Sequence, residues 1–215
     1  MAIAFDHAFV CTRVGAPGAR RLIEFGLREG APNRHPGQGT ANRRFFFRNA
    51  MLELLWVEDA EEAQSEQTRD TRLWERWSAA GRGASPFGII VRPGDGEGRV
   101  PFPAWEYRPE SMPGFAIHIA SDTQLAEPMW CYMEAGLRPD ERGHVLEHPV
   151  GFREITGVRL HCPLFDGSVV TPAMALAGVI ELEAGEEHAL ELEFDGNLTG
   201  NRCDFAPELP LVFCW

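Results

Sequence analysis

Short runs in which apolar and polar residues alternate recur along this chain, a pattern typical of β-strands that bury one side. In the first quarter of the sequence these runs predict strands at residues 5–11, 30–34, 42–48 and 51–57. Residues 19–27, between the first two strands, carry apolar side chains at helical spacing. Asn49 and Ala50 form a tight turn signal between the last two strands. The predicted order is therefore one strand, one helix and three strands.

The same pattern continues, less regularly, through the rest of the chain. Residues 71–80 have helical spacing, and residues 171–177 are predicted as a helix that begins with Pro172 near its first position. Residues 125–135 are predicted as a helix because Pro128 falls in the first turn, where proline is tolerated. Further strands are predicted at residues 86–93, 104–109, 115–121, 155–162, 179–184, 188–194 and 209–215.

A weak internal similarity favours a duplication. Residues 5–10 resemble residues 155–160, and residues 51–55 resemble residues 189–193. The order of strands and helices in the two regions supports this more than the few identities do. The domains predicted on this basis are a first βαβββ module in residues 1–60, a helix and extra strands that join the modules in residues 61–150, and a second, divergent βαβββ module in residues 151–215.

The charge of the chain excludes several classes of protein. The 215 residues carry a formal net charge of −12, and a protein this acidic is repelled by nucleic acids and anionic membranes. All 20 basic residues are arginine, so the chain can form neither a lysine Schiff base nor a P-loop lysine contact.

Localisation is predicted from what the sequence lacks. It has no apolar run long enough to span a membrane and no basic leader before an apolar stretch. Its five cysteines are scattered and never form a C-x-x-C pair, which favours reduced thiols. We therefore expect a cytoplasmic protein with no nucleic-acid and no membrane partner.

Two polar residues stand out on apolar strands. Glu53 is the one acidic residue of its strand, and such a carboxylate either reaches solvent or finds a partner in a cleft, because burying it alone is costly. His7 shares a predicted strand face with Phe5 and Phe9, where a histidine is often a core residue. An imidazole with carboxylates suits a divalent metal ion, and it equally suits a metal-free pair in which a carboxylate orients the imidazole for acid–base work. The sequence leaves both alternatives open.

Several nearby side chains could contact a ligand. Arg43 and Arg44 point to opposite sides of their strand, so at most one of them can face a cavity with Phe46 and bind a carboxylate or enolate. Trp105, on a central aromatic strand, is a candidate for the wall of a binding site.

The loop at residues 35–40 has two interpretations. It lacks the spacing of a nucleotide-binding loop, and its glycines are typical of a tight connection with positive φ. Alternatively, its backbone N–H groups and Asn42 line the mouth of a binding site.

The segments FDHAFV (5–10), HPGQGTANRRFFF (35–47) and MLELLWV (51–57) together resemble the vicinal oxygen chelate superfamily, the glyoxalase-like proteins. The resemblance is strongest over residues 5–58 and fainter over residues 154–215. The SPFGI, WEYRP and PLVF segments further resemble a set of bacterial glyoxalase-like proteins of unassigned activity. The resemblance implies an α+β fold of paired βαβββ modules, as in glyoxalase and bleomycin-resistance proteins, with curled mixed sheets that form a cup.

The resemblance also implies a site. Family members often hold a divalent metal through the first and fourth strands of each module, and the matching residues are His7, Glu53 and Glu191. Gly157 occupies the remaining first-strand position and cannot ligate. The replacement candidates that the sequence offers are His118, His148 and His161. In the enzyme hypothesis, Glu53 and Glu191 are catalytic and the metal is zinc, iron, manganese or nickel.

The function predicted from this resemblance is the binding of a small molecule in a sheet-lined cup. As an enzyme, the protein would be a metal-dependent isomerase, lyase or dioxygenase that acts on vicinal oxygens. Substrate contacts are expected from Asn42, Arg43, Arg44, Phe46 and Trp105. The alternative is a metal-free protein, without a cofactor, that binds or sequesters a small molecule such as a drug. In either case a homodimer is a possible assembly.

Overall fold

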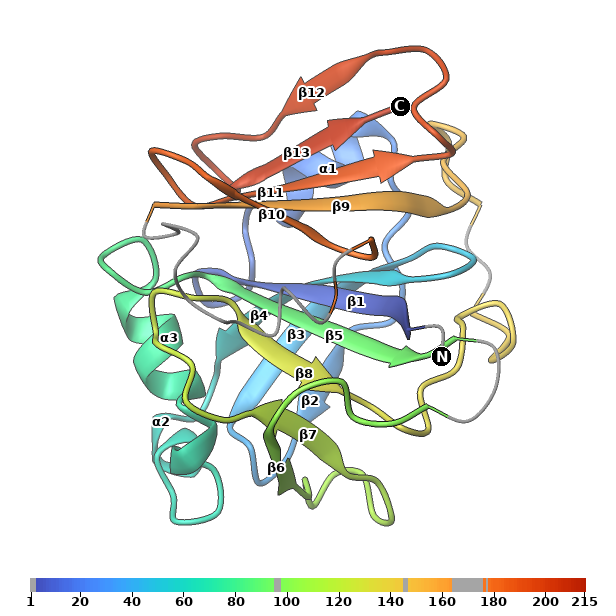
Figure 1. Ribbon diagram of the computed structural model, residues 1–215. Helices are drawn as coiled ribbons and strands as arrows, with labels where there is room; N and C mark the ends of the chain where they lie inside the picture. The colour runs from blue at the N-terminus through green and yellow to red at the C-terminus, as the bar shows by residue number, and fades with distance from the viewer. Residues whose placement is uncertain (1–2, 95–97, 145–146, 164–175, 177) are drawn as a thin grey trace.

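The computed structural model describes residues 3–94, 98–144, 147–163, 176 and 178–215. These residues form two mixed β-sheets with few, short helices, and the sheets pack against each other (Figure 1). The predicted α+β fold class is confirmed. In the described part of the chain, no helix combines the length and the apolar character needed to cross a membrane.

The first half of the larger sheet is the βαβββ unit that the sequence predicts. Its elements are β1 (Ile3–Cys11), α1 (Ala19–Phe25), β2 (Asn33–His35), β3 (Thr40–Phe46) and β4 (Met51–Val57). β1 pairs in parallel with β4, and β4, β3 and β2 follow in antiparallel order. Gly26 ends α1 with a φ of 112°, a conformation that glycine adopts without the steric cost of a Cβ.

The second half of the larger sheet comes from the segment that the sequence assigns to a connection, residues 61–150. Its strands are β5 (Phe87–Pro93), β6 (Ala104–Tyr107), β7 (Ile117–Ala120) and β8 (Met129–Tyr132). β5 is antiparallel to β1, and the order β2-β3-β4-β1-β5-β8-β7-β6 is symmetric about this central pair. These strands therefore mirror the first module within one sheet.

The helix predicted at residues 125–135 is wrong, because the centre of this segment is strand β8. Trp130 and Tyr132 pack into the core on one side of the sheet, and Met129 and Cys131 pack into a cluster on the other. A strand that is buried on both sides reads as a continuous apolar run, which periodicity cannot distinguish from a buried helix.

Three short helical segments follow the first module. They are α2 (Ala60–Ala63), the 3-10 helix η1 (Arg69–Thr71) and α3 (Leu73–Ala79). The prediction of a helix at residues 71–80 is confirmed by α3. Asp59 begins α2 as its N-cap, since its side chain accepts hydrogen bonds from two backbone N–H groups of the first turn.

The smaller sheet is built from the C-terminal strands in the order β10-β9-β11-β13-β12. These are β9 (Ile155–Cys162), β10 (Glu181–Ala184), β11 (Ala189–Phe194), β12 (Arg202–Asp204) and β13 (Leu211–Cys214). Neighbouring strands alternate between parallel and antiparallel pairing, as do β4-β1-β5-β8-β7 in the larger sheet. By this pairing β10, which is parallel to β9, corresponds to β4. Apart from residue 176, the helix predicted at 171–177 lies outside the described residues.

The two sheets enclose the main apolar core. Large buried residues of this core are Phe45, Leu52, Leu54, Ile89, Trp130 and Tyr132 from the larger sheet and Leu160, Leu190, Leu192, Phe194 and Phe213 from the smaller one. Burying an aliphatic or aromatic side chain of this size contributes about 1.5–3 kcal/mol. One face of the larger sheet is therefore buried against the smaller sheet, and its other face is not.

We call the other face of the larger sheet, which points away from the smaller sheet, the distal face. It carries a second apolar cluster, to which α3 also contributes. The buried residues of the cluster are Phe9, Cys11, Leu55, Leu73, Ile90, Tyr107, Ile119, Met129, Cys131 and Met133.

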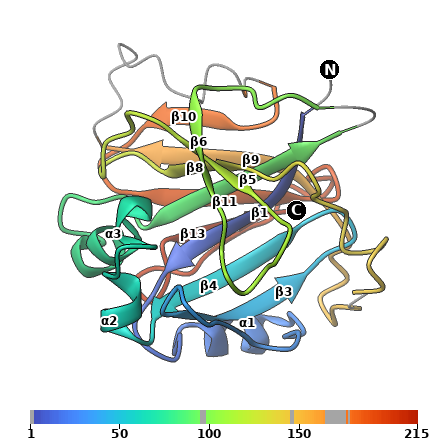
Figure 2. The ribbon, with the colours of Figure 1, turned by 90° about the horizontal axis from the view of Figure 1, so that it is seen from below.

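The larger sheet bends until its two edges approach each other over the distal face. Figure 2 shows β6 and the loop after it running across the other strands. Tyr107 of β6 donates a hydrogen bond of 3.4 Å to Gln38 Oε1, in the loop between β2 and β3. No strand pairing joins β6 to β2, so the sheet is not closed into a barrel. The distal face is therefore partly enclosed.

Candidate functional site

A β-bulge decides which side chains of β1 reach the distal face. The pairing of β1 with β5 shifts register between Phe5 and His7. Phe5 therefore stays in the core between the sheets, whereas Phe9 and Cys11 join the distal cluster. Bulges of this kind re-aim side chains and are frequent beside functional sites. The expectation that His7 shares a face with both phenylalanines is wrong for Phe5.

His7 lies between two carboxylates on the distal face. Its Nδ1 is 2.6 Å from Asp6 Oδ1, and its Nε2 is 3.7 Å from Glu53 Oε2. A carboxylate only accepts hydrogen bonds, so the contact with Asp6 requires a proton on Nδ1. In the neutral imidazole the lone pair is then on Nε2, and the gap to Glu53 is too wide for a direct hydrogen bond.

Glu53 is 6% exposed and is satisfied by a neighbouring strand. Its Oε1 accepts a hydrogen bond of 2.6 Å from Asn42 Nδ2, and Asn42 Oδ1 accepts one of 3.0 Å from the backbone N–H of Asn33. Buried polar groups are normally paired in this way. Of the two alternatives for Glu53, the structure shows a partnered carboxylate in the interior, not a solvated one.

The two histidines beside Glu53 have pKa values shifted in opposite directions. Burial lowers the pKa of His7, but the hydrogen bond and charge of Asp6 and the charge of Glu53 outweigh it, and the resulting pKa lies above 6.5. Burial dominates for His35 and lowers its pKa. Its Nδ1 lies 2.8 Å from Thr40 Oγ1. His7 is thus the imidazole of this pair that takes up a proton more readily.

Of the two adjacent arginines, Arg44 shares the distal face. Its guanidinium lies 5.1 Å from the centre of the Phe46 ring, and the charge of Glu53 acts on its pKa, which burial lowers. Arg43 points to the opposite side and forms a two-pronged ion pair with Glu29, at 2.6 and 2.5 Å. The two arginines thus lie on opposite sides of β3, and only Arg44 shares the face of Phe46. A role for Arg43 in substrate binding has no support in this geometry.

The glycine-rich loop is held as a tight connection. Gly37 and Gly39 have φ values of 79° and 69°, which favour glycine. Their backbone N–H groups both donate to Glu62 Oε2, at 2.9 and 3.0 Å. These two groups are therefore already occupied and do not offer donors to a ligand.

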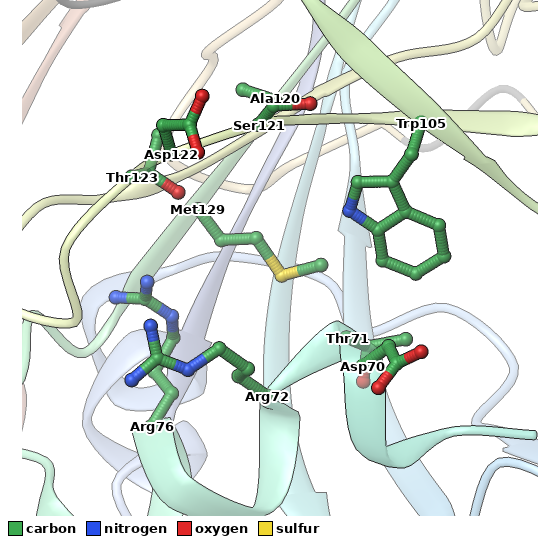
Figure 3. A pocket seen from close by; sticks show the side chains of 10 residues that line it. All are labelled: Asp70, Thr71, Arg72, Arg76, Trp105, Ala120, Ser121, Asp122, Thr123 and Met129. Carbon is green, nitrogen blue, oxygen red and sulfur yellow. The ribbon is translucent and has the colours of Figure 1, made fainter. Parts of the chain in front are cut away.

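Trp105 lies between two cavities at the β6 edge of the larger sheet. One, shown in Figure 3, has a volume of about 440 Å³, and the other has a volume of about 210 Å³. Trp105 lines both. His7 and Glu53 line neither of them.

Comparison with known protein families shows which family the first part of the chain resembles. Residues 5–99 match the family model described as a glyoxalase-like domain. This part of the chain is therefore similar to glyoxalase-like domains. The resemblance to the vicinal oxygen chelate superfamily is confirmed. The match covers the first module and β5, the strands that meet at the centre of the larger sheet.

A solved structure of similar fold supports the fold of this chain. A hypothetical protein from Staphylococcus aureus is 12% identical, with a TM-score of 0.52, and the match covers 99% of this chain and 98% of that one. A hypothetical protein from Bacillus halodurans C-125 is also 12% identical, with a TM-score of 0.38, over 64% of this chain and 98% of that one. No curated protein matches the chain in sequence. At this identity, the first likeness shows the fold alone.

The residues present do not fit the divalent metal that this family implies. Within the described residues, no three His, Cys, Asp or Glu side chains are placed to hold a metal ion. The second half of the larger sheet presents Ile90 and Cys131 on the distal face. Burial raises the pKa of Cys131 to about 12, which keeps the thiol protonated. His7 and Glu53 are therefore two donors without the third that a closed or open metal site requires.

Glu191 does not complete the set predicted with His7 and Glu53. It lies on β11 of the smaller sheet and forms an ion pair of 2.5 Å with Arg159. The alignment behind that prediction matched β11 to β4, but β11 runs antiparallel to β9 whereas β4 runs parallel to β1. Glu191 therefore has no fourth-strand position, and its predicted metal and catalytic roles have no support in this geometry.

The replacement histidines also lie elsewhere. His118 pairs with Glu134 at 3.3 Å, and His161 lies 3.9 Å from Glu183. His148 contacts the backbone, accepting from the N–H of Arg28 and lying 3.0 Å from the carbonyl oxygen of Phe46. None of them joins His7.

Asp6 is the site residue that sequence reasoning missed. Strict alternation places neighbours on opposite faces, so Asp6 and His7 were not expected to act together. The bulge removes that separation. The available signal was the Asp-His pair itself, an acid directly beside an imidazole within an apolar strand.

Proposed function

We propose that this glyoxalase-like chain binds a small organic molecule on its distal face and moves a proton with His7, without a metal ion. The contact between Asp6 and His7 Nδ1 carries this proposal, because it directs the basic Nε2 toward Glu53. An imidazole held by a carboxylate is a common general base, and such groups contribute about 10²–10⁴-fold to a rate.

In the proposed reaction, Nε2 of His7 takes a proton from a carbon next to a carbonyl group and returns it to a neighbouring atom. Asp6 holds the imidazole and stabilises its charged form. Arg44, on the same face, offers positive charge for the oxygen that becomes negative as the proton leaves. The atoms balance as an isomerisation, and no redox partner is needed.

The test is proton exchange at carbon. Hydroxyacetone, dihydroxyacetone and pyruvate are incubated with the protein and a chelator in D₂O, and loss of the signal next to the carbonyl is followed by NMR. We expect exchange above the uncatalysed rate with at least one of them, and a loss of about 100-fold or more in His7→Gln. Asp6→Asn should lose less, because the imidazole remains.

Glu191→Gln is the matched control, since it removes a carboxylate from the other sheet. Exchange that needs added metal, or that survives His7→Gln, would contradict the proposal.

The sequestering alternative makes a different prediction. A compound that raises the melting temperature would then be recovered unchanged, and His7→Gln would leave its affinity as it is.

A further inference from the structure

The larger of the two cavities beside Trp105 lies outside the His7 site. It lies between β6, the loop before β8 and the helical segments η1 and α3 (Figure 3). Its floor is buried and its rim is exposed. The floor consists of Thr71, Arg76, Ala120 and Met129, and the rim of Asp70, Arg72 and Asp122. A volume of about 440 Å³ falls within the usual range of small-molecule sites.

Arg76 is the unusual residue of this floor, because it is a buried cation with no anion. It is 4% exposed, and its Nη1 donates to the carbonyl oxygens of Ser85, Leu125 and Glu127, at 2.8, 3.1 and 2.7 Å. Among the described residues, no carboxylate lies within ion-pair distance of it. The three carbonyl groups fix the side chain through one nitrogen and leave Nε and Nη2 without a hydrogen-bond partner in the described structure.

A second cation stands next to Arg76. Figure 3 shows the guanidinium groups of Arg72 and Arg76 side by side, and the charge of Arg72 acts on the pKa of Arg76. Burial and this like charge bring the pKa of Arg76 down to about 10, although Glu127 and two thiols act in the other direction. Arg76 is thus still charged at neutral pH. A buried charge is costly unless it is paired, so this floor favours an anion.

The rest of the pocket is suited to a flat apolar group. Met129 points toward the ring of Trp105 in Figure 3, and both side chains belong to the distal apolar cluster. Aromatic side chains bind planar groups by stacking and edge contacts. The rim carboxylates Asp70 and Asp122 are exposed, and Asp70 lies 3.7 Å from Arg69. Arg72 is paired through Nε with Glu75 at 2.8 Å, so Arg76 is the pocket arginine that lacks an anion among the described residues.

We propose that this pocket binds a small aromatic carboxylate, with the carboxylate on Nε and Nη2 of Arg76 and beside Arg72, and the ring against Trp105 and Met129. Guanidinium groups recognise carboxylates by paired, charge-assisted hydrogen bonds. The proposal stands on the cavity and Arg76, and it does not depend on proton transfer by His7.

The experiment measures binding of 2-naphthoate to the full chain by calorimetry, with 2-naphthamide as the uncharged analogue. We expect saturable binding of the acid with a stoichiometry of one, and at least 10-fold weaker binding of the amide. Trp105→Ala should weaken 2-naphthoate about 10-fold, and Arg72→Gln several-fold.

Arg76→Lys keeps the charge but loses the planar fork, and we expect it to weaken 2-naphthoate more than Arg72→Gln does. Because Arg76 also ties three carbonyl groups together, the Arg72 and Trp105 variants test the pocket even where Arg76→Lys fails to fold. Arg82→Gln is the matched control, since it removes one exposed charge just after α3 without lining the pocket.

Wild-type affinity for 2-naphthoate in both Arg82→Gln and His7→Gln would support a pocket separate from the His7 site. The proposal is overturned by absence of 2-naphthoate binding, by equal affinity for 2-naphthamide, or by unchanged affinity in both Arg72→Gln and Trp105→Ala.

Discussion

The two halves of the larger sheet have the same strand order and very different chemistry. In the first half, the distal face gathers His7, Glu53 and Asn42 from β1, β4 and β3. In the second half, the matching strands β5 and β8 present Ile90 and Cys131. The strand order of the two halves is symmetric, but a metal site between them would need ligands from both halves, and the residues of the second half do not supply them.

The polar residues of the first half therefore form hydrogen bonds and ion pairs mainly with one another. Asp6 and Glu53 flank His7, and Asn42 donates to Glu53. The segment that supplies the second half also contributes charge: Arg92 Nε is 3.4 Å from Asp6 Oδ2, and the charge of Arg142 acts to lower the pKa of His7.

The largest effect on stability is expected from Asn42→Leu. This change removes the hydrogen bond of 2.6 Å to Glu53 and leaves a buried carboxylate without its donor. We expect a loss of about 3 kcal/mol in the free energy of unfolding, measured with urea. Asn33→Leu, on exposed β2, is the control and should cost less than about 0.5 kcal/mol. A cost below about 1 kcal/mol for Asn42→Leu would show that Glu53 does not need this partner.

The contact between the two halves is tested by Gly88→Ala. A Cβ at residue 88 would lie 1.9 Å from the Phe9 ring, so the ring must move. We expect a loss of about 2 kcal/mol, as for an overpacked core. Gly157→Ala on the smaller sheet is the comparison, because its Cβ would meet Glu193 at 3.1 Å. Equal costs for the two variants would contradict close packing of Phe9 on β5.

The charge on His7 makes stability depend on pH. The pKa of His7 is raised in the folded protein, so the protonated imidazole stabilises the fold. This stabilisation is fully present below the pKa of the unfolded chain, about 6.5, and is lost as the pH rises through the pKa of the folded protein. The stability difference between wild type and His7→Gln should therefore shrink over that window. Unfolding curves at a series of pH values measure it, and a difference that grows with pH would have the wrong sign. Asp6→Asn should flatten the dependence, because Asp6 is the main cause of the rise.

The smallest effect is expected from Glu191→Gln. Arg159 keeps its ion pairs with Glu181 and Glu183, at 2.7 and 3.2 Å, when that with Glu191 is lost. Partly exposed pairs of this kind contribute less than about 1 kcal/mol. A loss in the free energy of unfolding as large as that of Asn42→Leu would show that Glu191 has a larger role than this ion pair.

Local pattern predicted the first module well, since alternation, helical spacing and turn residues act within short segments. It placed Arg43 and Arg44 on opposite sides and identified His7 and Glu53. It failed where the outcome depends on distant strands. Which strand pairs with β9 is a non-local choice, and it separates Glu191 from the site.

Two other misses have local causes. The register shift in β1 brings Asp6 to His7, and alternation cannot foresee a bulge. β8 is buried on both sides and therefore lacks the period that marks a strand.

The most direct test of the central claim is the ¹⁵N NMR spectrum of the His7 side chain, recorded with and without one equivalent of zinc chloride. A metal-independent base oriented by Asp6 predicts a protonated Nδ1 and an unprotonated Nε2 in the neutral form, with no change when zinc is added. A shift of the Nε2 signal with zinc that disappears in Glu53→Gln would contradict the account and restore a metal to this site.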